Sequence, residues 1–560
     1  MPSAAARRDD REATLRLRQP GGLYEIGVED VRGRPMAVFR NRLRSLGQLL
    51  EASARFGERT YLVDGDTRIT FTEHLQRVRS LAGTFRRDHG VGPGDRVAIF
   101  AANRWEWVVA FWAAVAAGAV PAGFNGWWTA DEFTHATRLV EPVLVLADGP
   151  RLARVRDASY GGRVSDLGEV VAVSGRPVAD TEPVVEAQED EAALLLFTSG
   201  TTGRPKAATI PHRAVIGFVQ LNQFSELTGR VALGAPVPLR AEDVAPADDV
   251  QLVTSPLFHT SMLYGAVVTG LFKGSCSVLL PGRFDPERVL AAIERERVTQ
   301  WSALGSAATR LAACGALDRY DRSSMRYLGV GGAPVSPTVQ QRLRDAFPGT
   351  SATVGMGYTS TEAGAVVART GGPELAAHPT STGRVMVTVE VELRDPEGRP
   401  VEDGCDGEVH VLSPYVMLGY WNDQAATSAA LDDGGWLAMG DVARFEDGRL
   451  YINARARDLI FVNAENVAPT EVEYVLEAHP GVVEAAVLAS DDEVTGDAVW
   501  AVVVADGETA LGTADLTAWC RRSLAPYKVP TRWTFLDQPL PRTATGKVLK
   551  SALRGLDASG

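Results

Sequence analysis

The clearest chemical pattern in the sequence is the stretch Phe197-Thr-Ser-Gly-Thr-Thr-Gly-Arg-Pro-Lys206-Ala207, which directly follows an apolar strand pattern. Its glycines let the backbone turn tightly, its hydroxyls add hydrogen-bond donors, and Lys206 supplies a positive charge. Oriented backbone amides form an anion-binding nest, so the stretch suits a polyphosphate better than the alternative, a flexible surface turn. It is not a Walker A loop, because Lys206 follows Pro205 rather than glycine. The predicted phosphate-binding residues are Thr198, Ser199, Gly200, Thr201, Thr202, Gly203 and Lys206.

This stretch resembles the phosphate loop TSGTTGxPKA of the adenylate-forming superfamily of acyl-CoA synthetases, nonribosomal peptide adenylation domains and firefly luciferase. The resemblance covers almost the whole chain, because further motifs follow in the family's order. It implies a large N-terminal AMP-binding domain at residues 1–457. It also implies a mobile C-terminal domain at residues 458–560 that carries a catalytic lysine.

A second motif, Gly357-Tyr-Thr-Ser-Thr-Glu362, resembles the family's adenine and magnesium segment. The ring of Tyr358 can stack on a purine, Thr361 can bond the α-phosphate, and Glu362 offers a hard oxygen ligand for Mg²⁺. Gly331-Gly-Ala-Pro334 resembles the segment whose backbone lines adenine. The resemblance therefore places at the nucleotide Gly332, Ala333, Pro334, Gly357, Tyr358, Thr359 and Thr361.

Two charged residues match the family's ribose contacts, with small departures. Asp441 matches the aspartate that holds the ribose hydroxyls by charge-assisted hydrogen bonds, although Met439 stands where the family usually has threonine. Arg455 matches an arginine that reaches the ribose or phosphates, and Ala454 replaces the glycine before it. Outside the motif order, either charge would be interpreted as a solvated surface group.

Lys547, in Pro541-Arg-Thr-Ala-Thr-Gly-Lys547-Val-Leu-Lys550, resembles the family's catalytic lysine. It lies 341 residues beyond Lys206, so both serve one site only if the C-terminal domain folds back over the larger one. A cation there would relieve the repulsion between a substrate carboxylate and a triphosphate, worth about 4 kcal/mol for one charge pair at 4 Å and an effective dielectric near 20. Without the resemblance, Lys547 would be a solvated lysine in a loop.

The acid pocket and the hinge rest on the resemblance alone. Pro256-Leu-Phe-His259-Thr resembles the motif that gates the acyl site, and a packed histidine at a strand end is the alternative. Asp458 stands at the family's hinge position, and Asn463-Ala464 replaces the two glycines that usually border the pantetheine of CoA. The predicted pocket residues are His259, Trp301, Gly331 and Gly357, of which Trp301 either walls the pocket or packs the core; the predicted catalytic residues are Lys547, Thr198, Glu362 and His259.

The elements that must position these residues alternate between short apolar strands and helices. Strands are predicted at 95–101, 143–147, 170–173, 192–197, 251–254, 277–280 and 327–330, with a helix at 286–297. This alternation predicts an α/β fold with mostly parallel sheets packed by helices. Residues 228–249 are interpreted as a surface loop. From about residue 455 the pattern changes to a small α+β domain, with strands at 459–462, 482–489, 498–504 and 532–536, a helix at 516–524, and a helix whose capping box is Thr470 and Glu473.

Composition limits the other possibilities. The 560 residues carry a net charge of −13, which argues against a nucleic-acid binder. The first twenty residues have no apolar core of a signal peptide, and the apolar stretch Trp107–Phe124 is interrupted by Gly118 and Pro121, so it predicts a buried helix running into a strand rather than a membrane span. Four dispersed cysteines fit a reducing compartment, so a cytoplasmic protein is expected, either monomer or dimer.

The leading functional hypothesis is a carboxylate–CoA ligase. A carboxylic acid and ATP with Mg²⁺ would give an acyl adenylate and pyrophosphate, and the thiol of CoA would then attack the acyl carbon. Asn463-Ala464 keeps open a different acceptor, namely a carrier protein, an amine, or nitrite activation for diazotising an aryl amine, as in family members of specialised metabolism. A non-catalytic nucleotide-binding relative is a third possibility, which the retention of Lys206, Glu362, Asp441 and Lys547 disfavours.

Overall fold

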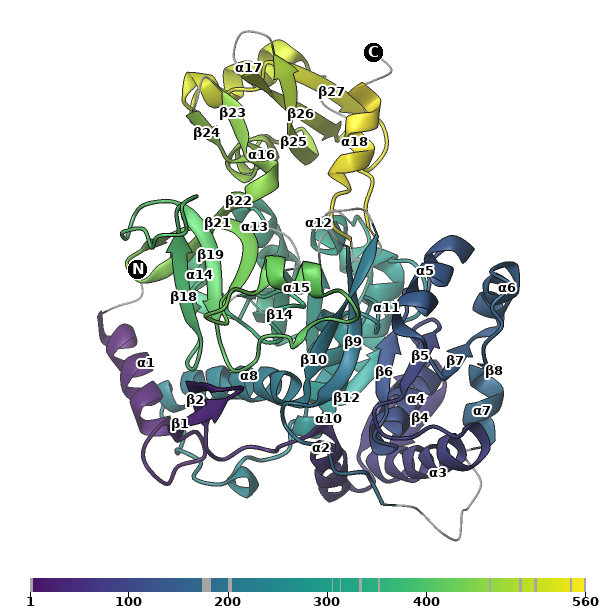
Figure 1. Cartoon of the computed structure of the whole chain (residues 1–560). Coiled ribbons are helices and arrows are strands. Elements are labelled where there is room, and N and C mark those ends of the chain that lie inside the picture. Colours follow the sequence, from purple (N-terminus) through teal and green to yellow (C-terminus); the bar gives the residue numbers. More distant parts are fainter. Residues whose placement is uncertain are drawn as a thin grey trace.

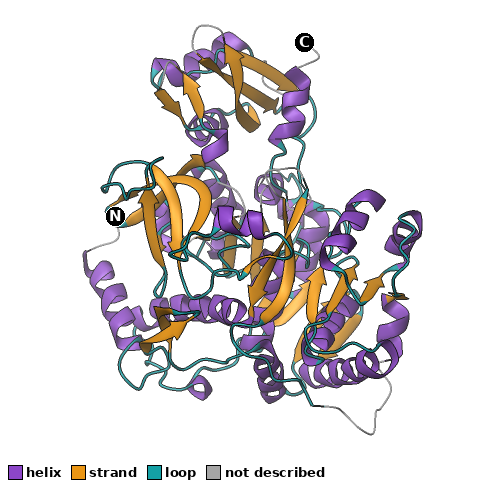
Figure 2. Cartoon of the chain, viewed as in Figure 1, coloured by secondary structure: helices purple, strands orange, loops and turns teal. Residues whose placement is uncertain are grey.

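The structure is a computed structural model, and it describes most of the chain. The described residues are 4–173, 183–199, 204–304, 306–312, 314–331, 335–350, 353–462, 465–492, 496–507, 511–543 and 546–557. Figure 1 shows a large body formed by the first four-fifths of the chain and a smaller C-terminal domain stacked on it. Figure 2 shows helices packed around the sheets of the body. This arrangement confirms the α/β architecture with a separate small C-terminal domain.

The first large sheet carries the phosphate loop. It has seven strands in the order β20-β10-β9-β6-β5-β7-β8, and its five strands from β9 to β8 run parallel. β10 returns antiparallel to β9 and β20 is antiparallel to β10, so β9 and β10 flank the predicted phosphate-binding stretch next to the edge strand β20. The strands are β5 (Arg96–Phe100), β6 (Val120–Gly123), β7 (Leu144–Ala147), β8 (Val164–Asp166), β9 (Ala192–Ser199), β10 (Pro205–Pro211) and β20 (Gly419–Tyr420).

The second large sheet supplies the other side of the site. Its nine strands follow the order β17-β16-β15-β14-β13-β11-β12-β3-β4, and the six from β15 to β3 are parallel. The carboxyl ends of parallel strands meet at one edge, so β14 and β15 end together there. The strands are β3 (Thr60–Asp64), β4 (Thr67–Thr70), β11 (Val250–Val253), β12 (Cys276–Leu279), β13 (Gln300–Leu304), β14 (Tyr327–Gly331), β15 (Gly355–Tyr358), β16 (Ala368–Gly371) and β17 (Arg384–Val385).

The largest hydrophobic core joins these sheets through helices buried nearly all round. α4 (Trp105–Ala116) is apolar and buried from Trp107 onward, and it leads into β6, as predicted for Trp107–Phe124. No helix in the described part of the chain is long and apolar enough to span a membrane. Other helices of the body are α1 (Ala4–Leu17), α2 (Leu46–Ala52), α3 (Phe71–His89), α5 (Ala130–Val140), α6 (Gly149–Asp157), α7 (Leu167–Val173), α8 (His212–Ala232), α9 (Thr260–Met262), α10 (Thr269–Lys273), α11 (Pro286–Glu296), α12 (Ser306–Ala312), α13 (Pro337–Ala346), α14 (Gly372–Ala377) and α15 (Gln424–Ala430).

Two antiparallel sheets complete the body, and the sequence did not predict them. A hairpin, β1 (Ile26–Val31) with β2 (Arg34–Phe39), lies near the N-terminus. A four-stranded sheet has the order β18-β19-β21-β22. Its last two strands lead the chain out to the C-terminal domain. The four strands are β18 (Glu390–Arg394), β19 (Gly407–Leu412), β21 (Leu437–Glu446) and β22 (Arg449–Arg455).

The C-terminal domain is a five-stranded sheet covered by helices. β24, β23, β26 and β25 are antiparallel neighbours, and β27 pairs parallel with β26. It has a hydrophobic core of its own. The elements are β23 (Ile460–Val462), β24 (Glu465–Val467), α16 (Pro469–Glu477), β25 (Val482–Asp492), β26 (Gly496–Ala505), α17 (Thr513–Cys520), β27 (Arg532–Leu536) and α18 (Lys550–Asp557).

Three local predictions are wrong. Residues 170–173 belong to helix α7, because the strand of that crossover, β8, comes just before them. The segment 228–249 is not all loop, since α8 continues to Ala232 and a short helical turn covers Ala241–Asp243. Thr470 and Glu473 form no capping box: Thr470 Oγ1 donates to the Asn453 carbonyl at 2.8 Å, and Glu473 accepts from the Val487 amide at 2.9 Å. The side chains of Thr470 and Glu473 instead connect α16 to neighbouring strands.

Gly364 provides a test of how tightly the chain after β15 is packed. Its φ is +71°, and a Cβ there would overlap the carbonyl oxygen of Tyr415. We expect Gly364→Ala to cost about 3 kcal/mol of unfolding free energy, from left-handed backbone strain plus overpacking. Gly21→Ala is the matched control, with φ +76° but open space around the new methyl, and should cost about 1 kcal/mol. Urea unfolding compares them, and equal midpoints would contradict this packing.

Candidate active site

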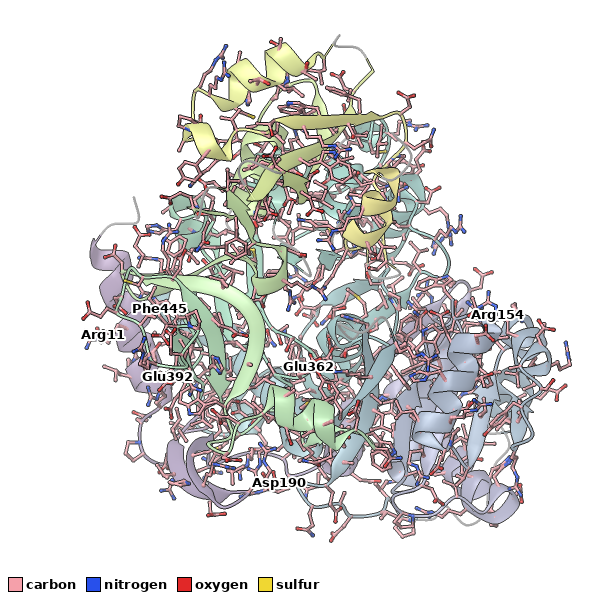
Figure 3. The ribbon with its side chains drawn as sticks, turned by 45° about the horizontal axis from the view of Figure 1, so that its top comes forward. Arg11, Arg154, Asp190, Glu362, Glu392 and Phe445 are labelled. Atoms are coloured by element: carbon pink, nitrogen blue, oxygen red, sulfur yellow. The ribbon has the colours of Figure 1, made fainter. Side chains whose placement is uncertain are left out.

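A large cavity lies between the two sheets of the body and the C-terminal domain. Its volume is about 3060 Å³, and residues from all the predicted motifs line it. Figure 3 shows Glu362 near the middle of the molecule, where these elements meet. The structure thus brings together Thr198, Lys206, His259, Gly331, Gly357, Tyr358, Thr359, Thr361, Glu362, Asp441, Arg455 and Lys547.

The predicted adenine and ribose residues form one hydrogen-bonded cluster. Tyr358, the last residue of β15, donates its hydroxyl to Asp441 Oδ2 at 2.6 Å. Arg455 Nε lies 2.9 Å from Asp441 Oδ1, and the β21–β22 register places the two residues directly opposite each other. Asp441 is 5% exposed. Burial raises its pKa, while Arg455, the Tyr358 hydroxyl and Lys547 act in the opposite direction.

The departure at Met439 changes the contacts beside this cluster. Its backbone carbonyl accepts a hydrogen bond from Arg455 Nη1 at 3.0 Å. A residue of any type at this position could accept this bond, because the acceptor is a backbone atom. Its sulfur lies 3.6 Å from the hydroxyl of Ser360, between Tyr358 and Glu362 in the sequence. Methionine therefore still connects β21 to the Gly357–Glu362 segment.

The phosphate side of the cavity is built on the β9–β10 hairpin. Thr198 and Lys206 face each other across its antiparallel register. Among the predicted phosphate-binding residues, Gly200, Thr201, Thr202 and Gly203 lie outside the described residues, and Ser199 is described in its backbone only. Gly332, Ala333 and Pro334, predicted to line adenine, also lie outside them.

Tyr420 is a site residue that the sequence analysis missed. Its hydroxyl donates to Glu362 Oε1 at 2.9 Å and is also hydrogen-bonded to Thr198. Its ring centroid lies 5.1 Å from Lys206 Nζ, a cation–π contact. β20 pairs with β10, so that Tyr420 stands opposite Ala208. A lone tyrosine in a short edge strand has no chemical signature in the sequence; only this pairing reveals it.

Glu362 fits the predicted magnesium ligand. Mg²⁺ in nucleotide sites is commonly held by one or two carboxylates together with substrate phosphates and water. Glu362 offers one carboxylate, oriented by Tyr420, whose strand β20 pairs with β10, the strand after the predicted phosphate-binding stretch. No cluster of three or more potential ligands from His, Cys, Asp and Glu occurs among the described residues. The donor set therefore suits an ion that arrives with a polyphosphate.

Lys547 enters the same cavity from the C-terminal domain. It lies in the loop before α18, closed by an antiparallel bridge between Arg542 and Val548. Lys547 stays partly open to solvent, yet desolvation by the surrounding cavity lowers the pKa of its ammonium. Arg455 adds to this, while Asp441 and Glu362 raise the pKa. These influences place the ammonium near Arg455, Asp441 and Glu362.

His259 caps the short helix α9 at the acyl side of the cavity. Its Nδ1 lies 3.0 Å from Ser261 Oγ. Burial, and then the charge of Lys547, lower its pKa to about 4. The imidazole is therefore neutral at pH 7 and adds no charge to the pocket.

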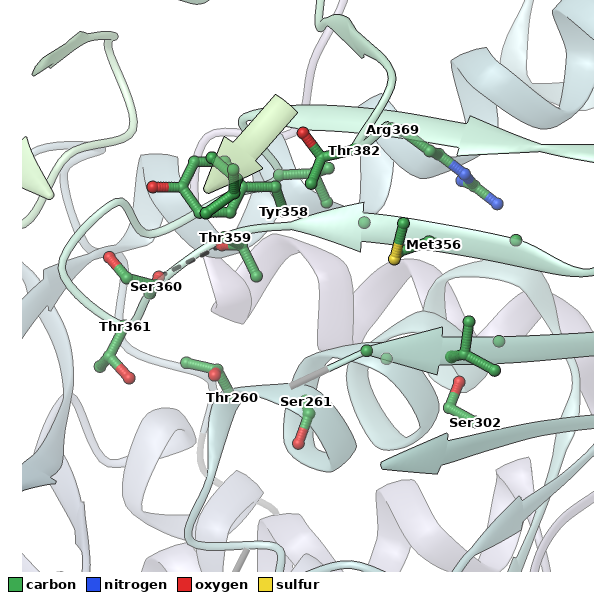
Figure 4. A pocket seen from close by; sticks show the side chains of 18 of the residues that line it. Thr260, Ser261, Ser302, Met356, Tyr358, Thr359, Ser360, Thr361, Arg369 and Thr382 are labelled. Atoms are coloured by element: carbon green, nitrogen blue, oxygen red, sulfur yellow. Dashed lines mark hydrogen bonds between the residues drawn. The ribbon is translucent and has the colours of Figure 1, made fainter. Parts of the chain in front are cut away.

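The glycines of the predicted pocket border open space, and Trp301 also lines the cavity although it is almost fully buried. A Cβ at Gly331 or Gly357 would meet no atom closer than 3.8 Å. Trp301 is 1% exposed, stacks on Phe284 with ring centroids 6.3 Å apart, and donates its indole N–H to Thr254 at 3.0 Å. The sequence left two interpretations of Trp301, a wall of the pocket or part of the core. Most of its side chain packs in the core. Figure 4 shows the pocket, with Thr260 and Ser261 beside the Tyr358–Thr361 segment.

The connection between the domains passes through Asp458. A helical turn, η6 (Ala456–Asp458), follows β22 directly and precedes β23. The carboxylate of Asp458 lies 4.0 Å from Arg554 of α18, its partner within the C-terminal domain. Asn463 and Ala464, the departures from the family's glycines, lie outside the described residues.

The contact between the domains includes a partly buried acid. Glu477, at the end of α16, hydrogen-bonds Ser336, the N-cap of α13 in the body. Burial raises its pKa to about 7, with further upward contributions from Glu473 and Glu484. Near neutral pH this carboxyl group is therefore partly protonated where the domains meet.

Comparisons with known proteins agree with this geometry. The AMP-binding enzyme family matches residues 49–421, and the AMP-binding enzyme C-terminal domain matches residues 471–547. The chain belongs to the AMP-binding enzyme family. As a member, it is an adenylate-forming ligase, as the motifs predicted.

Several relatives cover nearly the whole chain. A feruloyl-CoA synthase from Amycolatopsis is 36% identical over 497 residues, 88% of this chain and 94% of the relative. The structure of o-succinylbenzoate CoA synthetase from Bacillus subtilis, in complex with its acyl-adenylate intermediate, has a TM-score of 0.75 and 28% identity, covering 91% of this chain and 99% of that one. An amide bond synthetase from Marinactinospora thermotolerans has a TM-score of 0.77 and 28% identity, again covering 91% and 99%.

The hydroxyl of Tyr420 should matter for adenylate formation. Tyr420→Phe keeps the ring beneath Lys206 but removes the hydrogen bond to Glu362, and a bond to a charged group is worth about 1.5–3 kcal/mol. We expect kcat/KM for acid-dependent pyrophosphate release to fall about tenfold or more. Tyr415→Phe is the matched control, because that buried hydroxyl contacts Thr388 and does not line the cavity. Equal activity of Tyr420→Phe and wild type would contradict this role.

The contact between α13 and α16 should depend on pH. Because burial raises the pKa of Glu477 above its ordinary value of 4.5, to about 7, protonation favours the packed arrangement. Its contribution is complete below about pH 4.5 and is lost as pH rises through 7. A fluorophore pair on the two domains should therefore report looser packing at pH 8 than at pH 6, and Glu477→Gln should remove most of the difference. An unchanged pH response in the variant would show that other groups control the packing.

Proposed function

We propose that this enzyme activates a carboxylic acid with ATP and Mg²⁺ to an acyl adenylate, releasing pyrophosphate, and then transfers the acyl group to the thiol of CoA. The observation that carries the proposal is the meeting of Lys547 with Glu362 and Asp441 in one cavity. A structure of o-succinylbenzoate CoA synthetase in complex with ATP and a magnesium ion supports the first step, and relatives named as a feruloyl-CoA synthase and as 4-coumarate–CoA ligase-like support the second.

In the proposed first step, a carboxylate oxygen attacks the α-phosphorus and pyrophosphate leaves. Tyr358 would stack on adenine, and Asp441, held by Arg455, would accept from the ribose hydroxyls. Thr198, Lys206 and the loop between them would hold the phosphates, with Thr361 at the α-phosphate. Mg²⁺, held by Glu362, would neutralise phosphate charge when bound. Gly331 and His259 would border the acid, and Thr359 would support the adenine segment through its hydrogen bond to the Ala365 carbonyl at 2.6 Å.

Lys547 would act between the two reacting anions. A carboxylate approaching a triphosphate is repelled, and an ammonium at about 4 Å from each offsets about 4 kcal/mol per pair at an effective dielectric near 20. Its compact charge suits this position better than a planar guanidinium would. The lowered pKa of Lys547 belongs to the cavity without its nucleotide; the phosphates of ATP would favour the charged form.

For the second step, we infer that the C-terminal domain turns about Asp458. The ion pair with Arg554 joins Asp458 to the C-terminal domain, and the turn η6 is the short connection between the sheets. Rotation there would withdraw Lys547 once the adenylate has formed and open a path for the thiol. Asn463 and Ala464 would then border the acceptor.

An amine acceptor is the second candidate. The likeness to an amide bond synthetase, with 28% identity over 91% of this chain, favours it, as does the replacement of the family's two glycines by Asn463 and Ala464. Both candidates share the adenylation step. Incubating the enzyme with ATP, an accepted acid and either CoA or an amine separates them: a thioester supports the proposal, whereas an amide with no thioester favours the second candidate.

The adenylation step is tested by Lys547→Ala. We expect acid-dependent pyrophosphate release to fall at least a hundredfold, because the cation between carboxylate and triphosphate is lost, while ATP binding changes little. The release is followed with short, medium, aromatic and amino acids as substrates. Lys528→Ala is the matched control, since that lysine pairs with Glu471 in the same domain and does not line the cavity. Full activity of Lys547→Ala would overturn the proposal.

A further inference from the structure

The cavity has a second charged end, away from the phosphate side. Arg369 lies on β16, where the antiparallel register places it opposite Gly357. Its Nη1 donates to Asn222 Oδ1 at 2.9 Å, and its Nη2 donates to the hydroxyl of Tyr327 at 3.4 Å. Figure 4 shows Arg369 beside Met356, on the side of the pocket away from Thr361. All of these side chains line the cavity.

Arg369 has no carboxylate partner among the described residues, unlike the arginines near it. Arg384, its neighbour across β17, pairs with Glu374, and so does Arg449. A guanidinium has five N–H donors, and the two bonds of Arg369 go to neutral oxygens. A partly buried charge without an opposite charge is costly unless a ligand supplies one. The cavity therefore presents an unneutralised cation at its acyl end.

Space in front of Arg369 is kept open by glycines. Gly355 and Gly357 face β16 from β15, and neither has a side chain to fill the gap. Tyr327, which holds the guanidinium, would lie 2.8 Å from a Cβ on Gly355. Gly355 is three residues before Tyr358, about 10 Å along a strand. The guanidinium contacts the Tyr327 hydroxyl beside Gly355, so the cation lies toward the end of β15 away from Tyr358.

We propose that Arg369, supported by Asn222 and Tyr327, binds a second carboxylate at the far end of the acid, so that the preferred substrates are dicarboxylic acids. This inference rests on the proposed function, because it assigns the substrate class of the same site. A carboxylate matches the fork of a guanidinium and forms stronger bonds than neutral acceptors do. The Tyr327 hydroxyl, which accepts from Arg369, keeps its own proton to donate to the same carboxylate.

The direct test compares acids that differ only in the distal group. The probes are 4-carboxycinnamate and its 4-carboxamide, and the α,ω-dicarboxylates from succinate to suberate with their half-amides. Binding is measured by calorimetry and KM by pyrophosphate release. We expect at least one diacid to bind tenfold or more tightly than its amide. Diacids that all bind no better than their amides would overturn the inference.

Arg369→Met removes the positive charge of the side chain. Arg369→Lys keeps a positive charge but lacks the two-pronged hydrogen-bonding geometry of the guanidinium. We expect Arg369→Met to raise KM for the diacid at least tenfold with kcat changed less than threefold, to leave KM for the amide within threefold, and Arg369→Lys to recover part of the loss. Arg384→Met is the matched control, since that arginine already pairs with Glu374. A structural role alone would weaken diacid and amide equally, and that result would overturn the inference. Tight diacid binding without pyrophosphate release would instead overturn the proposed function and leave the binding site standing.

Discussion

In the proposed function, the repulsion between a carboxylate and a triphosphate is the constraint on which the rest of the site depends. Three cations from separate parts of the chain line the cavity: Lys206 on β10 beside the edge strand of one sheet, Arg455 on the antiparallel sheet, and Lys547 from the C-terminal domain. Collecting like charges in one cavity is itself unfavourable, which is why Arg455 contributes to the lowered pKa of Lys547. Asp441 and Glu362 offset that repulsion until a nucleotide arrives.

Two tyrosines hold those carboxylates in place without neutralising them. Tyr358 donates to Asp441 and Tyr420 donates to Glu362, and each comes from the end of a strand in a different sheet. A neutral hydroxyl orients a carboxylate but leaves its charge available to a ribose or a metal ion. The geometry of the cavity therefore depends on hydrogen bonds between sheets as much as on the motifs themselves.

The sequence predicted the parts of the site whose chemistry is local. Lys206, Glu362, Asp441 and Lys547 stand in ordered motifs, and the apolar strands between helices predicted the parallel sheets. Local sequence patterns do not reveal which distant strands pair with each other. The antiparallel sheet that carries Asp441 and the position of Tyr420 therefore became visible only in the structure. The spacing of Thr470 and Glu473 matches a capping box, which is why the sequence predicted one. In the structure both side chains instead form hydrogen bonds with the backbone of neighbouring strands.

The C-terminal domain completes the site in the arrangement seen here, because Lys547 lines the cavity together with residues of the body. A crystal structure of the enzyme with ATP and Mg²⁺ tests this convergence most directly. It should show adenine on Tyr358, the ribose on Asp441, and both Lys206 and Lys547 within hydrogen-bonding reach of phosphate oxygens. A nucleotide bound in the body at full occupancy, with the C-terminal domain docked as here and Lys547 remote from every phosphate, would contradict the account.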